Sequence, residues 1–359
     1  MPHTDEKMAK PTHRRLPWID AVKGCGITLV VLGHVANDSL VHSLIYVFHM
    51  PLFFFISGFL HKPQSNFIGY AKKKAIHLLV PYVCFAVLTS LLEAIRLRHN
   101  FTPAEIRHGL LIVTWGGSKM SGLYGVLWFL TCLFLTQQLM NWLMVKVGPI
   151  ALTTLTCLAF ALSYANSVLF PSFSLPLDAN VVLAAMPFFL AGYFFRDVEF
   201  SNWKWLLPGL IGFSLSIWLL IRQAPLSYDM RAGTYGVPIV SFVLALCCIL
   251  GVIYICRAVE NMPLFARSLH RLGAVSMSIM FIHKELPGLP RYTLLERQGV
   301  TVTFVIVLLI SYYLAVLLAR VSSTRALFLG SERDFQVIVK HRGLIAKIRS
   351  TVREQSKHT

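Results

Sequence analysis

The sequence predicts an all-α, polytopic membrane helix bundle, and two observations carry this prediction. First, 56% of the 359 residues are hydrophobic and only 14% are charged, whereas a soluble domain carries about 25% charged residues. Second, ten apolar runs approach the length of about 20 residues that an α-helix needs to cross a bilayer. They lie at residues 20–40, 42–60, 76–96, 122–145, 149–169, 180–195, 205–221, 236–256, 273–290 and 300–320. We therefore expect about ten transmembrane helices.

The distribution of basic residues predicts an orientation with both termini in the cytoplasm. The formal net charge is +17, and alternating ten spans from a cytoplasmic N-terminus puts most Lys and Arg residues on the inner side, as the positive-inside rule requires. Basic residues placed between apolar runs fit an anionic lipid surface, so we expect the bilayer as a partner and no nucleic acid. We therefore expect the chain to divide into a basic cytoplasmic N-terminus (1–15), a membrane domain (16–322) and a basic cytoplasmic tail (323–359).

The positions of the cysteines and the absence of common catalytic motifs argue against several classes of protein. All seven cysteines fall inside apolar runs and none forms a CxxC pair, which indicates small buried side chains, no disulfide framework and no metal site. The chain also has no HExxH, GxSxG, P-loop or dinucleotide-binding pattern. Metalloprotease, lipase, ATPase and dinucleotide-binding functions therefore lack support.

The first predicted span carries ionisable side chains on one face. At about 100° per residue, eleven steps from Lys23 to His34 leave roughly 20° after three turns, and Asp20 lies within about 40° of the same direction. Asp20 and Lys23 are spaced i,i+3 and can pair. Because ionisable groups inside a bilayer are costly, this face predicts a functional site. A plain anchor pair at the helix end, with His34 hydrogen-bonded between helices, is the alternative.

A second histidine follows in the next span. His49 lies beside Pro51, which frees the carbonyl of Val47 and predicts a kink. We expect His34 and His49 at comparable depths, facing one cavity; the alternative is a hydrogen bond from His49 to the freed carbonyl. Asp38, four residues after His34, is spaced to orient its imidazole.

These two spans resemble the membrane acyltransferase-3 family. The matching elements are IDxxKG at 19–24, VVLGH ending at His34, and FHMPLFFFISGFL at 48–60, with weaker echoes in LWFL at 127–130 and GAVSMSIMFIH at 273–283. The family's basic residue, followed by ten residues and a His, falls on Lys23 and His34. Many members have Arg at the basic position, whereas Lys resembles the fucose- and exopolysaccharide-acetylase-like members.

The resemblance implies an O-acyltransferase of the bacterial inner membrane. Such an enzyme would move an acetyl or other acyl group from cytoplasmic acetyl-CoA to a sugar hydroxyl of an exopolysaccharide, a lipopolysaccharide or a lipid-linked oligosaccharide. We expect His34 to take the hydroxyl proton, or to carry the acyl group, and basic residues to bind the phosphates of acyl-CoA. The expected catalytic residues are Asp20, Lys23, His34 and His49, and the expected acyl-CoA ligands are Lys23, Lys72, Lys73 and Lys74.

Two other functional classes remain as alternatives, and the roles of two further regions are open. A secondary transporter or flippase of a polysaccharide precursor also has broken spans and buried charges, and a structural membrane subunit would leave the Lys–His face unexplained. Trp115, Gly116, Gly117 and Tyr124 could pack against a sugar ring, or form an interfacial aromatic belt. For His283 we expect an interfacial, solvent-facing position; a place at the outer mouth of the same cavity is the alternative.

Overall fold

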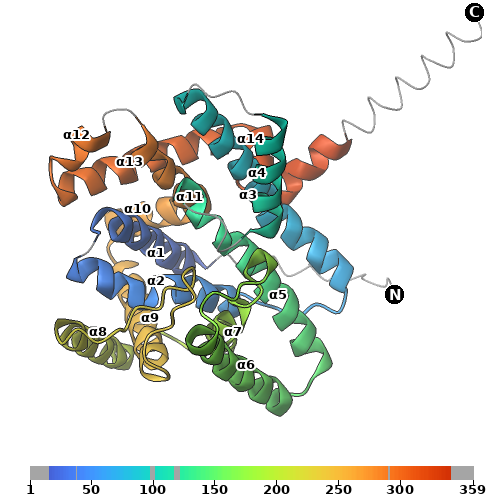
Figure 1. The fold of residues 1–359 in the computed structure, drawn as a ribbon. Coiled ribbons are helices and arrows are strands. Elements are labelled where there is room, and N and C mark those ends of the chain that lie inside the picture. Colours follow the sequence, from blue (N-terminus) through green and yellow to red (C-terminus); the bar gives the residue numbers. More distant parts are fainter. Residues whose placement is uncertain (1–15, 38, 98–101, 117–121, 290–291, 341–359) are drawn as a thin grey trace, which may run out of the picture.

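The computed structural model describes residues 16–37, 39–97, 102–116, 122–289 and 292–340, and its architecture is helical throughout this part of the chain (Figure 1). One isolated β-bridge joins Asp229 and Thr234. The first half comprises α1 (Pro17–Val35), α2 (Leu40–Phe59), α3 (Phe67–Leu97), α4 (Pro103–Trp115), η2 (Gly122–Val126), α5 (Trp128–Lys146), α6 (Pro149–Leu169), η3 (Pro176–Asp178) and α7 (Val182–Phe194). The second half comprises η4 (Trp203–Trp205), α8 (Leu206–Ile221), α9 (Val240–Val259), α10 (Pro263–Ala274), α11 (Ser276–Glu285), η5 (Leu286–Gly288), α12 (Tyr292–Glu296), α13 (Val300–Arg320) and α14 (Ser322–Phe328).

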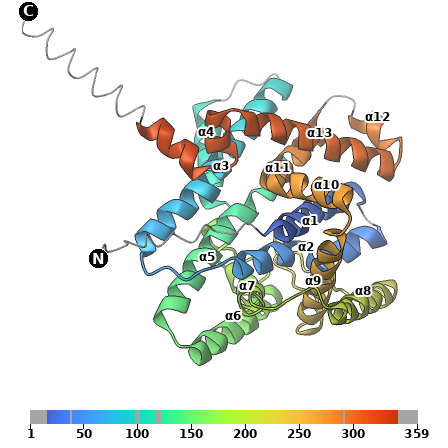
Figure 2. The same cartoon turned by 180° about the vertical axis from the view of Figure 1, so that it is seen from behind.

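Membrane crossing is supported by nine helical segments of the described chain that are long and apolar enough to span a bilayer. This confirms the predicted all-α, multi-pass membrane bundle. The segments differ in their surroundings. Of the most apolar stretch of α1, 61% is buried inside the protein, whereas only 17% is buried in the corresponding stretch of Trp203–Ile221, the segment that contains α8. The α8 surface is therefore suited to contact lipid, while α1 is enclosed by other helices (Figures 1 and 2).

Two of the expected spans differ from the structure. The run 273–290 is not one crossing, because α10 ends at Ala274 and α11 begins at Ser276, with Val275 between them outside helical geometry. The run 76–96 belongs to a longer helix, α3, which begins nine residues earlier and carries the lysine run at 72–74 inside it. Hydropathy alone misses such a helical extension because its residues are polar.

The centre of the bundle depends on close helix contacts. The α1 helix begins with Pro17 in its first turn, where the missing N–H costs nothing. Along α1, a Cβ on Gly24 would meet the carbonyl of Leu269 in α10, and a Cβ on Gly273 of α10 would meet the carbonyl of Asp20. These two glycines let the α1 and α10 backbones approach each other closely, as small residues do between membrane helices.

Candidate active site

One helix, α1, carries the three ionisable residues that the sequence places on one face. Lys23 Nζ lies 3.6 Å from Asp20 Oδ1, and both side chains are partly buried, so the expected pairing is present. His34 lies eleven residues further on, about 16 Å along the helix axis at 1.5 Å per residue. Lys23 and His34 thus belong to two different regions, one near each end of α1.

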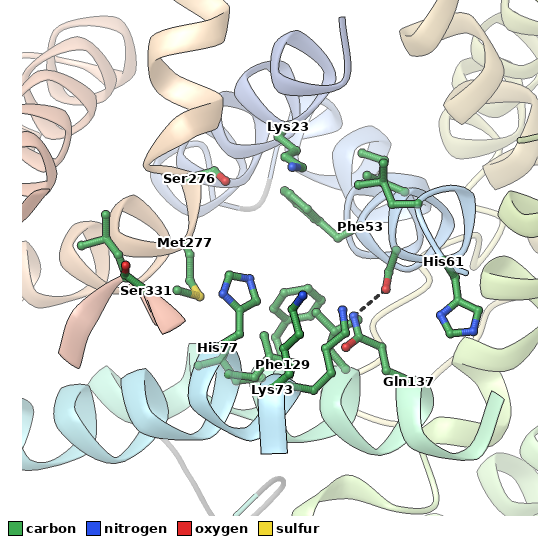
Figure 3. Close-up of a pocket in the computed structure, with 18 of the residues that line it drawn as sticks. Lys23, Phe53, His61, Lys73, His77, Phe129, Gln137, Ser276, Met277 and Ser331 are labelled. Atoms are coloured by element: carbon green, nitrogen blue, oxygen red, sulfur yellow. Dashed lines mark hydrogen bonds between the residues drawn. The ribbon is translucent and has the colours of Figure 1, made fainter. Parts of the chain in front are cut away.

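The region around Lys23 is a cavity of about 880 Å³ between α1, α2, α3, α5, the α10–α11 junction and the segment after α14. Figure 3 shows Lys23 of α1 facing Lys73 and His77 of α3 across this space. Its described lining contains no acidic side chain, whereas five basic side chains contribute to it: Lys23, Lys62, Lys73, Lys74 and Arg325. Such a cavity has the size of a small-molecule site and the charge to hold a phosphorylated ligand.

The lysine run of α3 contributes two of its three expected members to the cavity. Lys73 and Lys74 line it, and Lys74 Nζ lies 5.5 Å from the centre of the Tyr70 ring. Lys72 is not part of the lining. Consecutive residues on a helix point about 100° apart, so three successive lysines cannot share one face.

Two buried polar side chains of the cavity wall each have one atom without a hydrogen-bond partner within the described residues. Gln137 donates from Nε2 to the Ser57 hydroxyl at 2.7 Å, but its Oε1 is buried and unpartnered; the dashed line in Figure 3 marks the bond. His61 shares a 3.3 Å hydrogen bond with Tyr70, and its Nε2 is unpartnered. Burial, with the charges of Lys74 and Arg196, lowers the pKa of His61 to about 4. Such unpaired groups are positions where a ligand's amide or hydroxyl would be held.

The start of the expected cytoplasmic tail closes one side of the cavity. Arg325 donates to both carboxylate oxygens of Asp334 at 2.9 Å, and the carbonyl of Gly330 accepts a 3.3 Å hydrogen bond from His77 Nδ1. Lys73 lies 3.9 Å from Glu332. We call residues 325–334 the strap. The predicted continuation of this tail over 341–359 lies outside the described residues.

The part of the cavity lining nearest to His34 along α1 is apolar. It includes Ile27 of α1 and Met280 of α11. His34 lies two helical turns beyond Ile27, and His283 lies one turn beyond Met280. A chain extending from the basic part of the cavity along these helices would therefore approach the two histidines.

The region around His34 is a cluster of four histidines and one tyrosine. The ring centres of His34 and His283 are 5.2 Å apart, and those of His34 and Tyr46 are 6.2 Å apart. Tyr46 also contacts His42 at 4.0 Å and His49 at 4.6 Å. The cluster thus joins α1, α2 and α11, which the sequence separates by up to 249 residues.

Backbone carbonyls hold three of these rings. Nδ1 of His42 bonds Gly33 O at 2.8 Å, and Nδ1 of His283 bonds Ile279 O at 2.9 Å. Nδ1 of His49 bonds Ile45 O at 3.0 Å. Because a carbonyl only accepts, each Nδ1 must donate, which leaves each Nε2 as an acceptor in the neutral ring.

The structure corrects two expectations about the histidines and one of the alternatives. The ring of His49 is hydrogen-bonded to the carbonyl of Ile45, four residues before it, and not to the carbonyl of Val47. It also does not share the depth of His34, because His34 lies in the last turn of α1 while His49 lies in the middle of α2. His283 is not solvent-facing: only 3% of it is exposed, and it contacts His34.

The other expected positions either lie outside the described residues or have no contact with the cluster. Asp38 and Gly117 lie outside the described residues, while Trp115 ends α4 and is exposed. The Tyr124 hydroxyl donates to Glu93 at 3.1 Å and is bonded to Ser90. Sequence reasoning missed His42 and Tyr46, although their i,i+4 spacing on α2 was readable.

Comparisons with known proteins identify relatives of the chain. The family described as an acyltransferase domain matches residues 16–320. The nodulation protein NolL of Sinorhizobium fredii (strain NBRC 101917 / NGR234) is 31% identical over 134 residues, which are 33% of this chain and 35% of that protein. The match therefore spans about a third of the length of this relative. No solved structure matches the chain.

Proposed function

The chain belongs to the acyltransferase-3 family and is a membrane acyltransferase, and from this premise we propose that it transfers an acetyl or acyl group from acyl-CoA to a sugar hydroxyl. The donor occupies the basic cavity at the Lys23 end of α1, and the reaction takes place at His34. The observation that carries the proposal is a cavity with five basic and no acidic described lining residues, which opens beside Lys23 on the same helix that carries His34.

The composition of the cavity suits the separate parts of acyl-CoA. The nucleotide end of acyl-CoA carries phosphates, and Lys23, Lys73 and Lys74 supply the positive charge to bind them. The pantetheine arm of acyl-CoA carries two amide N–H groups, and the unpartnered Oε1 of Gln137 can accept a hydrogen bond from one of them. The acyl group carried by the thioester is apolar, like the part of the wall with Ile27 and Met280.

The proposed reaction needs one base. The acceptor oxygen attacks the thioester carbonyl, its proton passes to a nitrogen of His34, the C–S bond breaks, and the CoA thiolate then takes up that proton. Alternatively, His34 attacks first and the acyl group stays on its nitrogen until the hydroxyl displaces it. An imidazole suits either role at neutral pH. Asp20 holds Lys23 beside the donor in both versions.

The acceptor and the location complete the proposal. The acceptor is a hydroxyl of an exopolysaccharide, a lipopolysaccharide or a lipid-linked oligosaccharide, which reaches His34 from the opposite side to the donor. The excess of basic residues favours the Lys23 end as the cytoplasmic end. We place the protein in the bacterial inner membrane on this basis.

The test combines a cellular and a purified-protein measurement. Polysaccharide O-acetyl content is measured in a deletion strain that carries the wild type, His34→Ala or the control His108→Ala, all at equal membrane abundance. His108 is exposed on α4, away from the cavity. Acyl-CoA binding to the purified protein is measured in parallel.

We expect O-acetyl groups to return with the wild type and with His108→Ala but not with His34→Ala. Acyl-CoA should bind to all three. If the deletion leaves O-acetylation unchanged while a lipid-linked sugar accumulates on one side of the membrane, the transporter alternative replaces the proposal.

A further inference from the structure

We propose that His283 is the positioning residue of His34: its Nε2 accepts a hydrogen bond from the His34 ring and so directs the other His34 nitrogen, as a base, toward the acceptor hydroxyl. The inference rests on the proposed acyl transfer at His34. It gives to His283 the orienting role for which the sequence suggested Asp38.

The tautomer of His283 follows from its hydrogen bond. Its Nδ1 lies 2.9 Å from the carbonyl of Ile279 and must donate, since a carbonyl has no proton. The neutral ring then carries its lone pair on Nε2. This atom is buried and has no hydrogen-bond partner among the described residues. A buried acceptor without a donor is unfavourable, which calls for a donor nearby.

His34 is placed to supply that donor. The centres of the two rings are 5.2 Å apart, and their planes are inclined by 32°. The His34 ring, unlike those of His42, His49 and His283, forms no hydrogen bond with a described side chain or carbonyl. Catalytic hydrogen bonds are often long before substrate binds and shorten in the complex, so a small rotation of His34 would join the two rings.

The other titratable groups around His34 are less suited to accept its proton. Lys284 of α11, with His42 and His49 of α2, acts electrostatically on His34. A lysine ammonium has no acceptor atom. The ring contacts of both α2 histidines are with Tyr46, and Tyr46 meets His34 edge-on with centres 6.2 Å apart.

The proposed hydrogen bond has a defined chemical consequence. When His34 donates to His283, its second nitrogen keeps the lone pair that takes the hydroxyl proton, and that proton later passes to the CoA thiolate. Without His283, the His34 ring would populate both tautomers and more orientations. Partners that orient metal-ligating histidines typically contribute about 10- to 100-fold to activity, and we expect a loss of this size when His34 loses its orienting partner.

Three variants of His283 separate this role from a structural one. His283→Asn keeps a donor near Ile279 O but places no acceptor at the Nε2 position, His283→Gln can place an amide oxygen there, and His283→Leu has neither. We expect kcat to fall about 10- to 100-fold in His283→Asn and His283→Leu, with KM for acyl-CoA nearly unchanged. His283→Gln should recover part of the loss, and the acidic limb of the pH profile should move in His283→Asn.

Activities within a few fold of wild type in all three variants would overturn the proposal, as would His283→Gln being no better than His283→Leu. The Asn and Gln variants are similar in polarity, so their comparison stands even if His283→Leu does not accumulate in the membrane.

A second measurement does not depend on acyl transfer. Nitrogen NMR of histidine-labelled protein in lipid bilayers, with the His34 signal identified by its loss in His34→Ala, reports the tautomer of His34. We expect one neutral tautomer in the wild type and a mixture in His283→Asn. A mixture in the wild type would refute the pairing, while absent transferase activity with a single tautomer would refute only the proposed function.

Discussion

The two ends of α1 differ in how their polar groups are held. At one end, Lys23, Lys73 and Arg325 surround a cavity and keep much of their charge accessible, with ion pairs at its edge. At the other end, His42, His49 and His283 are held by carbonyls one helical turn or one loop away. The first arrangement suits binding of a charged ligand and the second suits proton transfer in fixed geometry, so substitutions at the two ends should affect different kinetic constants.

The largest effect is expected at His34. His34→Ala should lower kcat about 10²- to 10⁴-fold, the usual contribution of a general base. The dissociation constant for acyl-CoA should stay within about twofold, because loss of a group that acts only in the chemical step leaves ground-state binding unchanged. Single-turnover kinetics and equilibrium binding on the purified protein measure the two quantities. A parallel loss of binding would show that the two ends of α1 are not separate.

Lys23 should show the opposite pattern. Lys23→Met should weaken acyl-CoA binding about 10- to 100-fold, because a hydrogen bond to a charged group contributes about 1.5–3 kcal/mol. Lys23→Arg should keep most of the affinity. The matched control is Lys204→Met in η4, an exposed lysine outside the cavity. If Lys23→Met binds acyl-CoA normally but has no activity, then Lys23 belongs to the chemical step.

Gln137 tests whether the donor's arm follows the cavity wall. Gln137→Leu should weaken acyl-CoA binding by about fivefold, which corresponds to one neutral hydrogen bond of about 1 kcal/mol. Binding of a CoA fragment without the pantetheine arm, such as adenosine 3′,5′-bisphosphate, should not change. Equal weakening of both ligands would mean that Gln137 supports the cavity rather than the arm.

The smallest effect is expected at the strap. Two hydrogen bonds from Arg325 and one from Ser331 hold the pKa of Asp334 well below its usual range. The contribution of this carboxylate is therefore present above the pKa of a free Asp and is lost only as pH falls through the lowered folded value. Asp334→Asn should raise the dissociation rate of acyl-CoA only a few fold, because Asp334 itself does not line the cavity and Arg325 keeps its hydrogen bonds to Ser322 and to the carbonyl of Ala319. An unchanged rate would show that the strap does not retain the ligand.

Residue spacing along the sequence was sufficient to predict some features of the site but not others. The pairing of Asp20 with Lys23 follows from i,i+3 spacing, and the structure shows it. The depth of His49 did not follow, since it depends on α1 ending at Val35 and α2 beginning at Leu40. Helix ends are set by capping and packing, such as the Ser39 hydroxyl that accepts from the His42 N–H, and hydropathy does not resolve them.

The sequence by itself determined the membrane helix bundle, the acyltransferase-3 resemblance and the face shared by Lys23 and His34. Each depends on composition or on short-range helical periodicity, which is written in consecutive residues. Only the tertiary structure decided that Arg325 completes the wall of the cavity and that His283 contacts His34. Those contacts join segments more than 200 residues apart, which meet only through helix packing such as the close approach of α1 and α10 at Gly24 and Gly273.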